Sequence, residues 1–228
     1  MVYLAHELIE RPKKVRPHAV ILGAGASLAA FPMGDARGRK LPLMNSVIPT
    51  LELGPLLEGV SSVAGITNFE QAYSALYEDV DSRDIREEVE RRVHKYFSEM
   101  RMPDQATLYD VLVLSLTPDD AIFSFNWDPF LFDAWERNRH VAPPPRIFFL
   151  HGNVRIEFCE DDSRTLKVGT PCPICGRRGR SLPLLYPTAR KNYSSDPGIA
   201  AAWVAAAEYL SECLTLTIFG YGAPSSDV

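Results

Sequence analysis

Four short apolar segments, each followed by glycine or a polar side chain, constrain the fold of this chain most strongly. They are residues 18–22, 120–125, 146–150 and 214–219, and stretches of helical length separate them. Parallel strands need crossover connections, which are usually helices, so alternating strands and helices predict a parallel sheet covered on both faces. We therefore expect an α/β protein with a Rossmann-like, doubly wound parallel sheet. A further strand is predicted at residues 184–186.

Helix signals occupy the connections between these strands. The clearest helix is predicted over residues 84–100, where apolar side chains recur every four positions along one stripe. Asn68 and Asp196 have the side chains that cap helix N-termini, and their helices are predicted to run to about Tyr77 and Cys213. Shorter helices are expected directly after the glycines at 23 and 25, at residues 107–116, and up to about Arg139.

Composition narrows the class of protein. The chain has 228 residues, of which 46% are apolar and 23% are charged, and this balance excludes intrinsic disorder. The length suits one large domain with a small inserted module. A formal charge of -5 gives no whole-domain basic footprint, so no nucleic-acid surface is predicted.

Neither a membrane segment nor a secretory leader is expected. The longest apolar stretch, residues 198–210, is too short to span a bilayer and contains Glu208. The N-terminus carries Glu7 and Glu10, and no apolar run follows a basic start. The four cysteines are too few for a disulfide scaffold, so a cytoplasmic, reducing location is predicted.

Changes in composition suggest the domain organisation. Residues 1–17 read as a basic, proline-bounded N-terminal arm, and residues 18–228 as the main domain. Residues 154–183 contain three of the four cysteines among mixed charges, and we expect them to form an inserted module. The chain stops at Val228, directly after its last motif, so we expect it to be part of a longer protein with a regulatory domain or partner. Homo-oligomers are compatible with this interpretation.

Gly23 and Gly25 lie between the first predicted strand and a helix of small residues. Glycines at this position let backbone N–H groups approach a phosphate near a helix N-terminus. The usual dinucleotide fingerprint has a third glycine, and here that position is Leu28. The turn therefore fits either a phosphate cradle or a tight connection between strand and helix.

Polar side chains follow two other strands. Asn126 and Asp128 can orient water, an amide or a ribose hydroxyl, or they can form an Asx turn at the start of the next helix. His151 ends an apolar strand and precedes Gly152. Its imidazole suits a general base near neutral pH, and the alternative is a structural histidine at the edge of the core.

Cysteines point to a metal site. Cys172 and Cys175 form a Cys-Pro-Ile-Cys-Gly segment, whose spacing is typical of a zinc knuckle. Cys159 and Asp162 offer a thiolate and a carboxylate at the same spacing. These four residues are the candidate zinc ligands, and the alternative is a module that kept the turn without a metal.

Taken together and in order, these motifs resemble those of the sirtuin-like (silent-information-regulator-type) superfamily of NAD-consuming proteins. The matching segments are Gly23-Ala-Gly-Ala-Ser27, Ser124-Phe-Asn-Trp-Asp128, Leu150-His-Gly152, the cysteine insert that begins at Cys159, and Gly220-Tyr-Gly-Ala-Pro-Ser-Ser-Asp227. The last segment is most similar to the divergent bacterial branch associated with defence.

The resemblance implies roles for the matching positions. Asn126 would position the nicotinamide ribose and the attacking group, and His151 would be the general base. The residues that it places around NAD are Gly23, Ala24, Gly25, Ala26, Ser27, Asp35, Asp128, Gly152, Gly220, Tyr221 and Asp227. NAD is then the substrate, and zinc is an additional candidate component.

Departures from the family pattern favour one reaction over another. Phe125 replaces a glutamine that is common in protein deacylases, and residues 184–193 lack the strand with which deacylases clamp an acyl-lysine peptide. Water then becomes the natural acceptor, which predicts an NAD glycohydrolase that releases nicotinamide and ADP-ribose as a bacterial antiviral effector. The alternatives are an NAD-dependent protein deacylase and a non-catalytic NAD or ADP-ribose sensor.

Overall fold

The computed structural model of the chain describes residues 16–188 and 191–223. Four of its strands form a parallel sheet in the order β3-β2-β1-β7. These strands are β1 (His18–Leu22), β2 (Ala121–Ser124), β3 (Arg146–Phe149) and β7 (Thr215–Phe219). The predicted α/β architecture is confirmed, and all four strands lie within one residue of the predicted positions.

The register of this sheet brings the strand ends together. Leu22 of β1 lies opposite both Ser124 of β2 and Phe219 of β7, and Ser124 lies opposite Phe149 of β3. Because the strands are parallel, the residues that follow them leave the sheet at the same edge. The four motifs predicted at strand ends therefore meet there.

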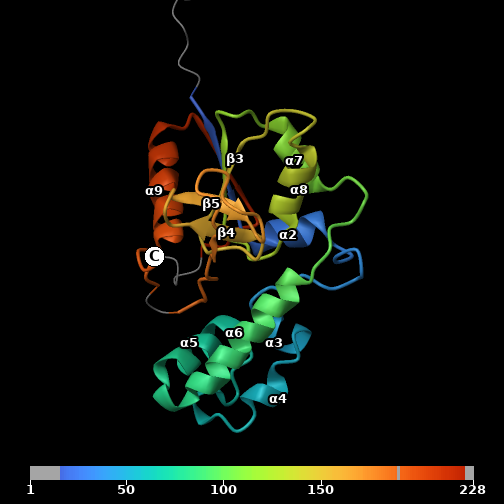
Figure 1. Ribbon diagram of the computed structural model, residues 1–228. Helices are drawn as coiled ribbons and strands as arrows, with labels where there is room; N and C mark the ends of the chain where they lie inside the picture. Colours follow the sequence, from blue (N-terminus) through green and yellow to red (C-terminus); the bar gives the residue numbers. More distant parts are fainter. Residues whose placement is uncertain (1–15, 189–190, 224–228) are drawn as a thin grey trace, which may run out of the picture.

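Helices cover both faces of the sheet (Figure 1). On one face, Ala19 and Phe123 pack with Ala202 and Ala206 of α9 (Pro197–Glu212). On the other face lie α2 (Ala24–Ala30), α7 (Leu108–Ser115) and α8 (Phe130–Asn138). Asp196 caps α9 as predicted, because its carboxylate accepts the backbone N–H groups of Gly198 and Ile199.

A second, helical lobe lies beyond the carboxyl edge of the sheet (Figure 1). It contains α3 (Val47–Thr50), α4 (Gly54–Leu57), α5 (Phe69–Glu78), α6 (Arg83–Ser98) and two short 3₁₀ helices, Ser61–Val63 and Val80–Ser82. The predicted stripe on α6 is correct, since Val89, Val93 and Phe97 are buried. Asn68 caps α5 by accepting the N–H of Gln71.

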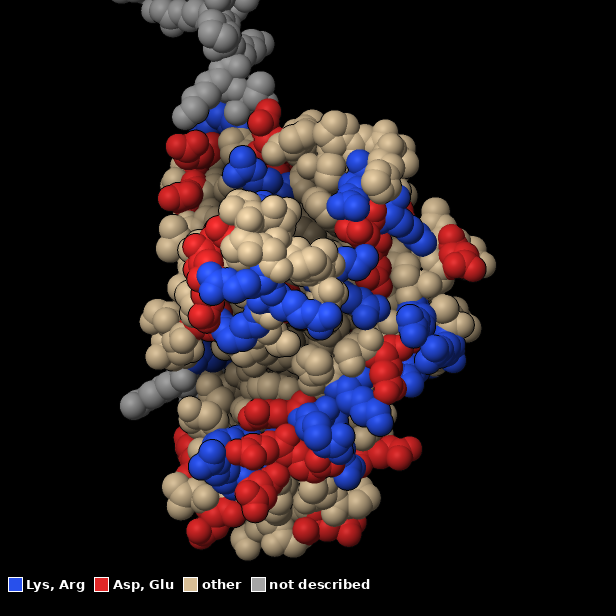
Figure 2. Space-filling view, in the orientation of Figure 1, with Lys and Arg blue, Asp and Glu red and all other residues tan. Residues whose placement is uncertain are grey.

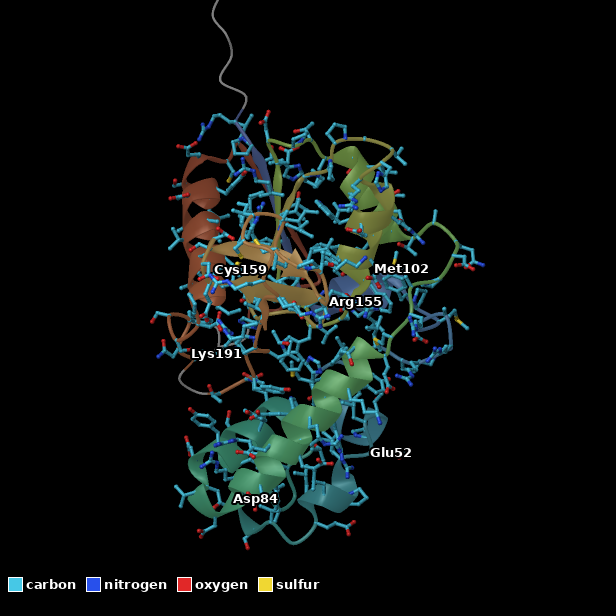
Figure 3. The ribbon with its side chains drawn as sticks, in the orientation of Figure 1. Glu52, Asp84, Met102, Arg155, Cys159 and Lys191 are labelled. Atoms are coloured by element: carbon cyan, nitrogen blue, oxygen red, sulfur yellow. The ribbon has the colours of Figure 1, made fainter. Side chains whose placement is uncertain are left out.

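The cysteines lie in a small antiparallel sheet of order β5-β4-β6, formed by β4 (Ile156–Cys159), β5 (Arg164–Lys167) and β6 (Arg180–Ser181). Arg155, which precedes β4, links this sheet to its surroundings (Figure 3). Its guanidinium pairs with Asp133 of α8 and donates to the carbonyl oxygens of Ser98 and Met100 at the end of α6. The cysteine module is thus attached to both lobes.

The strand predicted at residues 184–186 does not form, so that prediction was wrong. Pro183 and Pro187 flank the segment, and proline cannot donate a hydrogen bond to a ladder. The segment instead runs beside the end of β3, where the N–H of Leu185 donates to the carbonyl oxygen of His151 at 2.9 Å.

Charges of both signs are interspersed over the face shown in Figure 2, including the helical lobe. Basic side chains gather over the cysteine module, but several are paired there, as in Arg180 with Glu160 and Arg177 with Asp161. Among the described helices, none combines the length and apolar character needed to cross a bilayer.

Candidate functional site

A cavity of about 430 Å³ lies at the carboxyl edge of the parallel sheet, between the sheet and the helical lobe. Nine of the predicted site residues line it: Gly23, Ala24, Gly25, Ser27, Asn126, Asp128, His151, Gly220 and Tyr221. The structure therefore brings four separate strand ends into one site.

The glycines at this edge allow two backbone segments to cross closely. The N–H of Gly23 donates to the carbonyl oxygen of Phe219 at 3.1 Å, and that of Gly25 donates to Gly220 at 2.9 Å. A Cβ atom on Gly23 would lie 2.6 Å from the Gly220 oxygen. Two of the N–H groups considered for a phosphate cradle are therefore already paired, and these glycines serve the tight connection.

Asn126 has a fixed side-chain orientation. Its amide nitrogen donates to the carbonyl oxygen of Gly23 at 3.0 Å and to the hydroxyl of Ser27 at 2.9 Å. Both N–H groups are thereby used, because a primary amide has only two. No side chain or backbone group among the described residues donates to its Oδ1, which is left to accept from a bound molecule in the cavity.

Asp128 is buried behind Asn126, with only 4% of its surface exposed. One carboxylate oxygen accepts from the Ser27 hydroxyl at 2.7 Å, and the other accepts from the backbone N–H of Phe130 at 3.1 Å. Burial raises the pKa of Asp128 to about 6, against the opposing effect of the Ser27 hydrogen bond. The residue thus forms the predicted Asx-type turn and also reaches the site.

His151 stands at the end of β3, on the wall of the cavity. Its ring meets that of Phe125 edge-on, with centroids 4.7 Å apart, and lies nearly parallel to Tyr193 at 6.1 Å. The turn that follows requires glycine, because Gly152 has φ +75° and a Cβ there would lie 2.0 Å from the Pro183 oxygen. Gly152 therefore shapes the turn beside His151 and does not line the cavity.

Asn153 ends the segment 151–153 that follows β3, and the sequence assigned it no role in the site. Its side-chain amide donates to the carbonyl oxygens of Asn126 at 3.2 Å and Asp128 at 2.7 Å. Asn153 is 1% exposed, so these bonds are shielded from water. They hold the loop after β3, which carries His151, against the loop after β2. Its place two residues after His151 was the only available signal.

The walls of the cavity are largely apolar. Phe125 stacks on Tyr221 with ring centroids 4.2 Å apart and an interplanar angle of 14°. Trp127 lines the same cavity, together with Met44 and Phe97 of the helical lobe. This contribution of the helical lobe was not predicted, because Phe97 belongs to the apolar stripe of α6 and Met44 lies in the loop before α3, where neither has a pattern that indicates ligand binding.

The remaining predicted NAD-binding residues lie elsewhere. Asp35 does not line the cavity. Its carboxylate accepts three backbone N–H groups, from Arg37 and Arg39 at 2.8 Å and from Arg101 at 3.0 Å, which fixes the loop before the helical lobe. Ala26 is buried beneath the turn. Asp227 lies outside the described residues.

Cys159, Asp162, Cys172 and Cys175 form one compact group, in which one ligand atom from each lies within 4.8 Å of the others. The Sγ atoms of Cys159 and Cys175 are 3.5 Å apart, and Cys172 Sγ is 3.0 Å from an Asp162 oxygen. Tetrahedral zinc with Zn–S bonds of about 2.3 Å places its sulfurs about 3.8 Å apart. The four predicted ligands therefore fit a structural zinc ion. Cys159 is labelled in Figure 3.

Comparison with known proteins gives similarity at the level of solved structures. No family model matches the chain, and no curated protein matches it. One similar structure is a Sir2 variant with a deacetylated p53 peptide and 3'-O-acetyl ADP ribose, at 16% identity and a TM-score of 0.41, covering 93% of this chain and 75% of that one.

A second similar structure is a complex of a Sir2 homologue with NAD. It has 13% identity and a TM-score of 0.40, and the match covers 99% of this chain and 77% of that one. Both are structures of the family that the sequence motifs resemble. The likeness concerns the fold alone.

Proposed function

We propose that this chain is an NAD glycohydrolase, which cleaves the bond between nicotinamide and ribose and releases nicotinamide and ADP-ribose. The observation that carries the proposal is the meeting of Asn126, Asp128, His151 and the turn at residues 23–27 around one cavity. The sequence motifs that resemble NAD-consuming proteins are the segments that form this site.

The proposed reaction exchanges one bond at the anomeric carbon of the ribose. The C–N bond to nicotinamide breaks, and its electron pair neutralises the positively charged pyridinium nitrogen. Water forms the new C–O bond and loses a proton, so NAD⁺ and water give nicotinamide, ADP-ribose and a proton. Because the sugar develops positive charge in the transition state, positioning and charge stabilisation account for most of the catalysis.

Each polar residue of the cavity has a role in this scheme. Asn126 Oδ1 accepts a hydrogen bond from a ribose hydroxyl or from the attacking water. His151, which follows the neighbouring strand β3, takes up the proton. The negative charge of Asp128, near Asn126, favours a cationic sugar when the carboxyl is ionised, and its pKa of about 6 means that this holds near neutral pH.

The cavity wall beside His151 and the segment of residues 184–186 bear on the choice of acceptor. The stacked pair of Phe125 and Tyr221 covers the side of the cavity next to His151. Residues 184–186 do not offer a strand to an extended peptide. The missing strand supports water as the acceptor over an acyl-lysine side chain.

A product assay tests this proposal. Purified protein is incubated with NAD alone and with NAD plus an acyl-lysine peptide, and nicotinamide, ADP-ribose and deacylated peptide are quantified. We expect equal amounts of nicotinamide and ADP-ribose in both samples, and loss of both products with His151→Ala. Peptide consumption in a one-to-one ratio with NAD would identify a deacylase instead, and tight NAD binding without any product would identify a sensor.

The proposal extends to the cell and to the cysteine module. By resemblance to the divergent sirtuin-like branch, we place the chain in the cytoplasm as an effector of antiviral defence, where depletion of NAD would be the toxic event. Cys159, Asp162, Cys172 and Cys175 would hold zinc, which would cross-link the module and take no part in bond cleavage.

A further inference from the structure

Tyr109 belongs to none of the sequence motifs, yet its hydroxyl contacts two residues that line the cavity, Ser27 and Asn126. The residue belongs to α7 and is completely buried. Its hydroxyl oxygen is 2.7 Å from Ser27 Oγ and 3.3 Å from the amide nitrogen of Asn126. Three polar side chains from three different elements therefore converge behind the cavity wall.

The directions of these hydrogen bonds follow from the number of protons available. Ser27 has one hydroxyl proton, which it donates to Asp128 at 2.7 Å. Its oxygen must then accept, so the Tyr109 hydroxyl donates to Ser27 Oγ. Burial, together with the nearby Asp128 carboxylate, raises the pKa of Tyr109 far above its usual range. Tyr109 consequently remains protonated and retains its donor.

The number of available protons also determines the orientation of the Asn126 side-chain amide. If the amide were rotated by 180°, its oxygen would face the carbonyl oxygen of Gly23, which has no proton to donate. Ser27 Oγ would be equally unsuitable, since its only proton is committed to Asp128. The Tyr109 hydroxyl, 3.3 Å from the same amide nitrogen, could not donate to the reversed oxygen either, because its proton goes to Ser27 Oγ. The chain from Tyr109 through Ser27 to Asp128, together with the Gly23 carbonyl, therefore keeps Asn126 Oδ1 toward the cavity.

Tyr109 is itself held firmly. Thr107 and Asp110 form a capping box at the start of α7, with the Asp110 carboxylate accepting the Thr107 N–H at 2.6 Å. Asp110 is also paired with Arg137 of α8, which ties the two helices together. The Tyr109 ring meets Phe31 edge-on at 5.8 Å. Its hydroxyl therefore has a defined position relative to the sheet.

We propose that Tyr109 is a positioning residue for Asn126: its hydroxyl orders the Ser27–Asp128 pair so that the Asn126 amide presents its oxygen to the bound substrate. The catalytic consequence of this inference rests on the proposed glycohydrolase function. The orientation of the Asn126 amide is independent of the proposed function and can be measured separately.

Tyr109→Phe tests the inference, because it removes only the hydroxyl and keeps the ring. The matched control is Tyr73→Phe, since Tyr73 is also buried and its hydroxyl donates to Glu90 at 2.5 Å, away from the cavity. The direct readout is the pair of Asn126 side-chain amide signals in a ¹⁵N–¹H spectrum, assigned by their absence from Asn126→Ala.

We expect Tyr109→Phe to shift the Asn126 amide signals and to speed their exchange with water, while Tyr73→Phe leaves them unchanged. Nicotinamide release should lose about 10-fold in kcat with little change in KM, because one charge-linked hydrogen bond is removed from the ordering network and substrate contacts remain. Incorporation of 4-aminophenylalanine at position 109, which restores a donor, should recover the wild-type spectrum.

Unchanged Asn126 signals in a folded Tyr109→Phe protein would overturn the inference, whatever the enzyme does with NAD. Altered signals in a protein without any NAD turnover would instead uphold the positioning role and count against the proposed function. If Tyr109→Phe does not fold, the test is made on the wild-type protein. A slowly exchanging Tyr109 hydroxyl proton with a nuclear Overhauser contact to the Asn126 amide would support the inference. The absence of this signal would contradict it.

Discussion

Gly220 lies so close to Ala26 that a Cβ atom on Gly220 would be 1.9 Å from the Ala26 backbone nitrogen. This approach joins the end of β7 to the turn after β1. It also sets one edge of the cavity, because Gly220 and the neighbouring Gly25 both line it. The glycines that first suggested nucleotide binding are thus required for the crossing of two backbone segments.

Gly220→Ala should therefore destabilise the protein strongly. Gly59→Ala is a matched control, since Gly59 also has a positive φ, +84°, against +63° for Gly220, but no atom lies within 4 Å of its added Cβ. The control should lose about 1 kcal/mol of unfolding free energy from backbone strain alone. We expect Gly220→Ala to lose at least about 3 kcal/mol in urea denaturation, and equal losses would contradict the close crossing.

Asp128 predicts a particular pH dependence of stability. Its folded pKa of about 6 is above the value of about 3.9 expected in the unfolded chain. The folded state therefore binds the proton more tightly, and this contribution to stability is present below about pH 4 and is lost as the pH rises through about 6. The loss amounts to at most about 3 kcal/mol.

Asp128→Asn removes this titration. The unfolding free energy of the variant minus that of the wild type should become more positive between pH 4 and pH 7.5, since only the wild type carries the buried charge. Urea denaturation at both pH values measures the difference. If the difference in unfolding free energy did not change with pH, the pKa of Asp128 would not be raised in the folded protein.

The contribution of Asp110 to stability should depend on pH in the opposite direction. Burial alone would raise the pKa of Asp110, but its bonds to Arg137, Thr107 and Asn138 hold it well below the usual range. Its contribution is then present above about pH 4 and is lost as the pH falls toward the folded pKa.

For Asp110→Asn we expect a loss of about 2 kcal/mol of unfolding free energy at pH 7, given that the Arg137 side chain is partly exposed. The loss should shrink in urea titrations at pH 3. A larger loss of unfolding free energy at pH 3 than at pH 7 would be inconsistent with the ion pair.

The cysteine group predicts one zinc ion per chain. Cys172→Ser should remove the metal and lower the melting temperature of the cysteine module, because a ligand of the tetrahedral set is lost. Cys213→Ser is the matched control, since Cys213 lies outside the group. Metal analysis of the purified proteins gives the answer, and equal zinc contents in the two variants would refute this assignment.

Much of the fold was predictable because its strands are short, uninterrupted segments rich in apolar and β-branched residues, although β7 is exposed to solvent. Residues 18–22 and 214–219 are short runs of apolar and β-branched residues bounded by proline, cysteine or glycine, and their length and flanking residues predict strands. The strand predicted at 184–186 does not form. That prediction relied on the apolar side chains and gave too little weight to the prolines on both sides, which cannot donate hydrogen bonds to a sheet. Residues 51–63 gave no clear periodicity, and they form short helical turns that depend on tertiary packing.

The candidate site was predictable where chemistry follows a strand. Asn126, Asp128 and His151 were found in this way, because parallel strands deliver their ends to one edge. No role was predicted for Tyr109 or Asn153, since Tyr109 acts through Ser27 and Asn153 binds backbone carbonyl groups, and neither has a local pattern that distinguishes it. Asp35 illustrates the reverse case, where a conspicuous acidic residue is committed to three backbone N–H groups.

The most direct test of the account is the rate of nicotinamide release from NAD by the wild-type protein and by Asn126→Ala, with NAD affinity measured on both. The proposed function predicts release by the wild type, a fall of at least about 100-fold in kcat for the variant, and similar NAD affinity, because Asn126 acts mainly in the transition state. No release by the wild type, or equal rates in the two proteins, would contradict it.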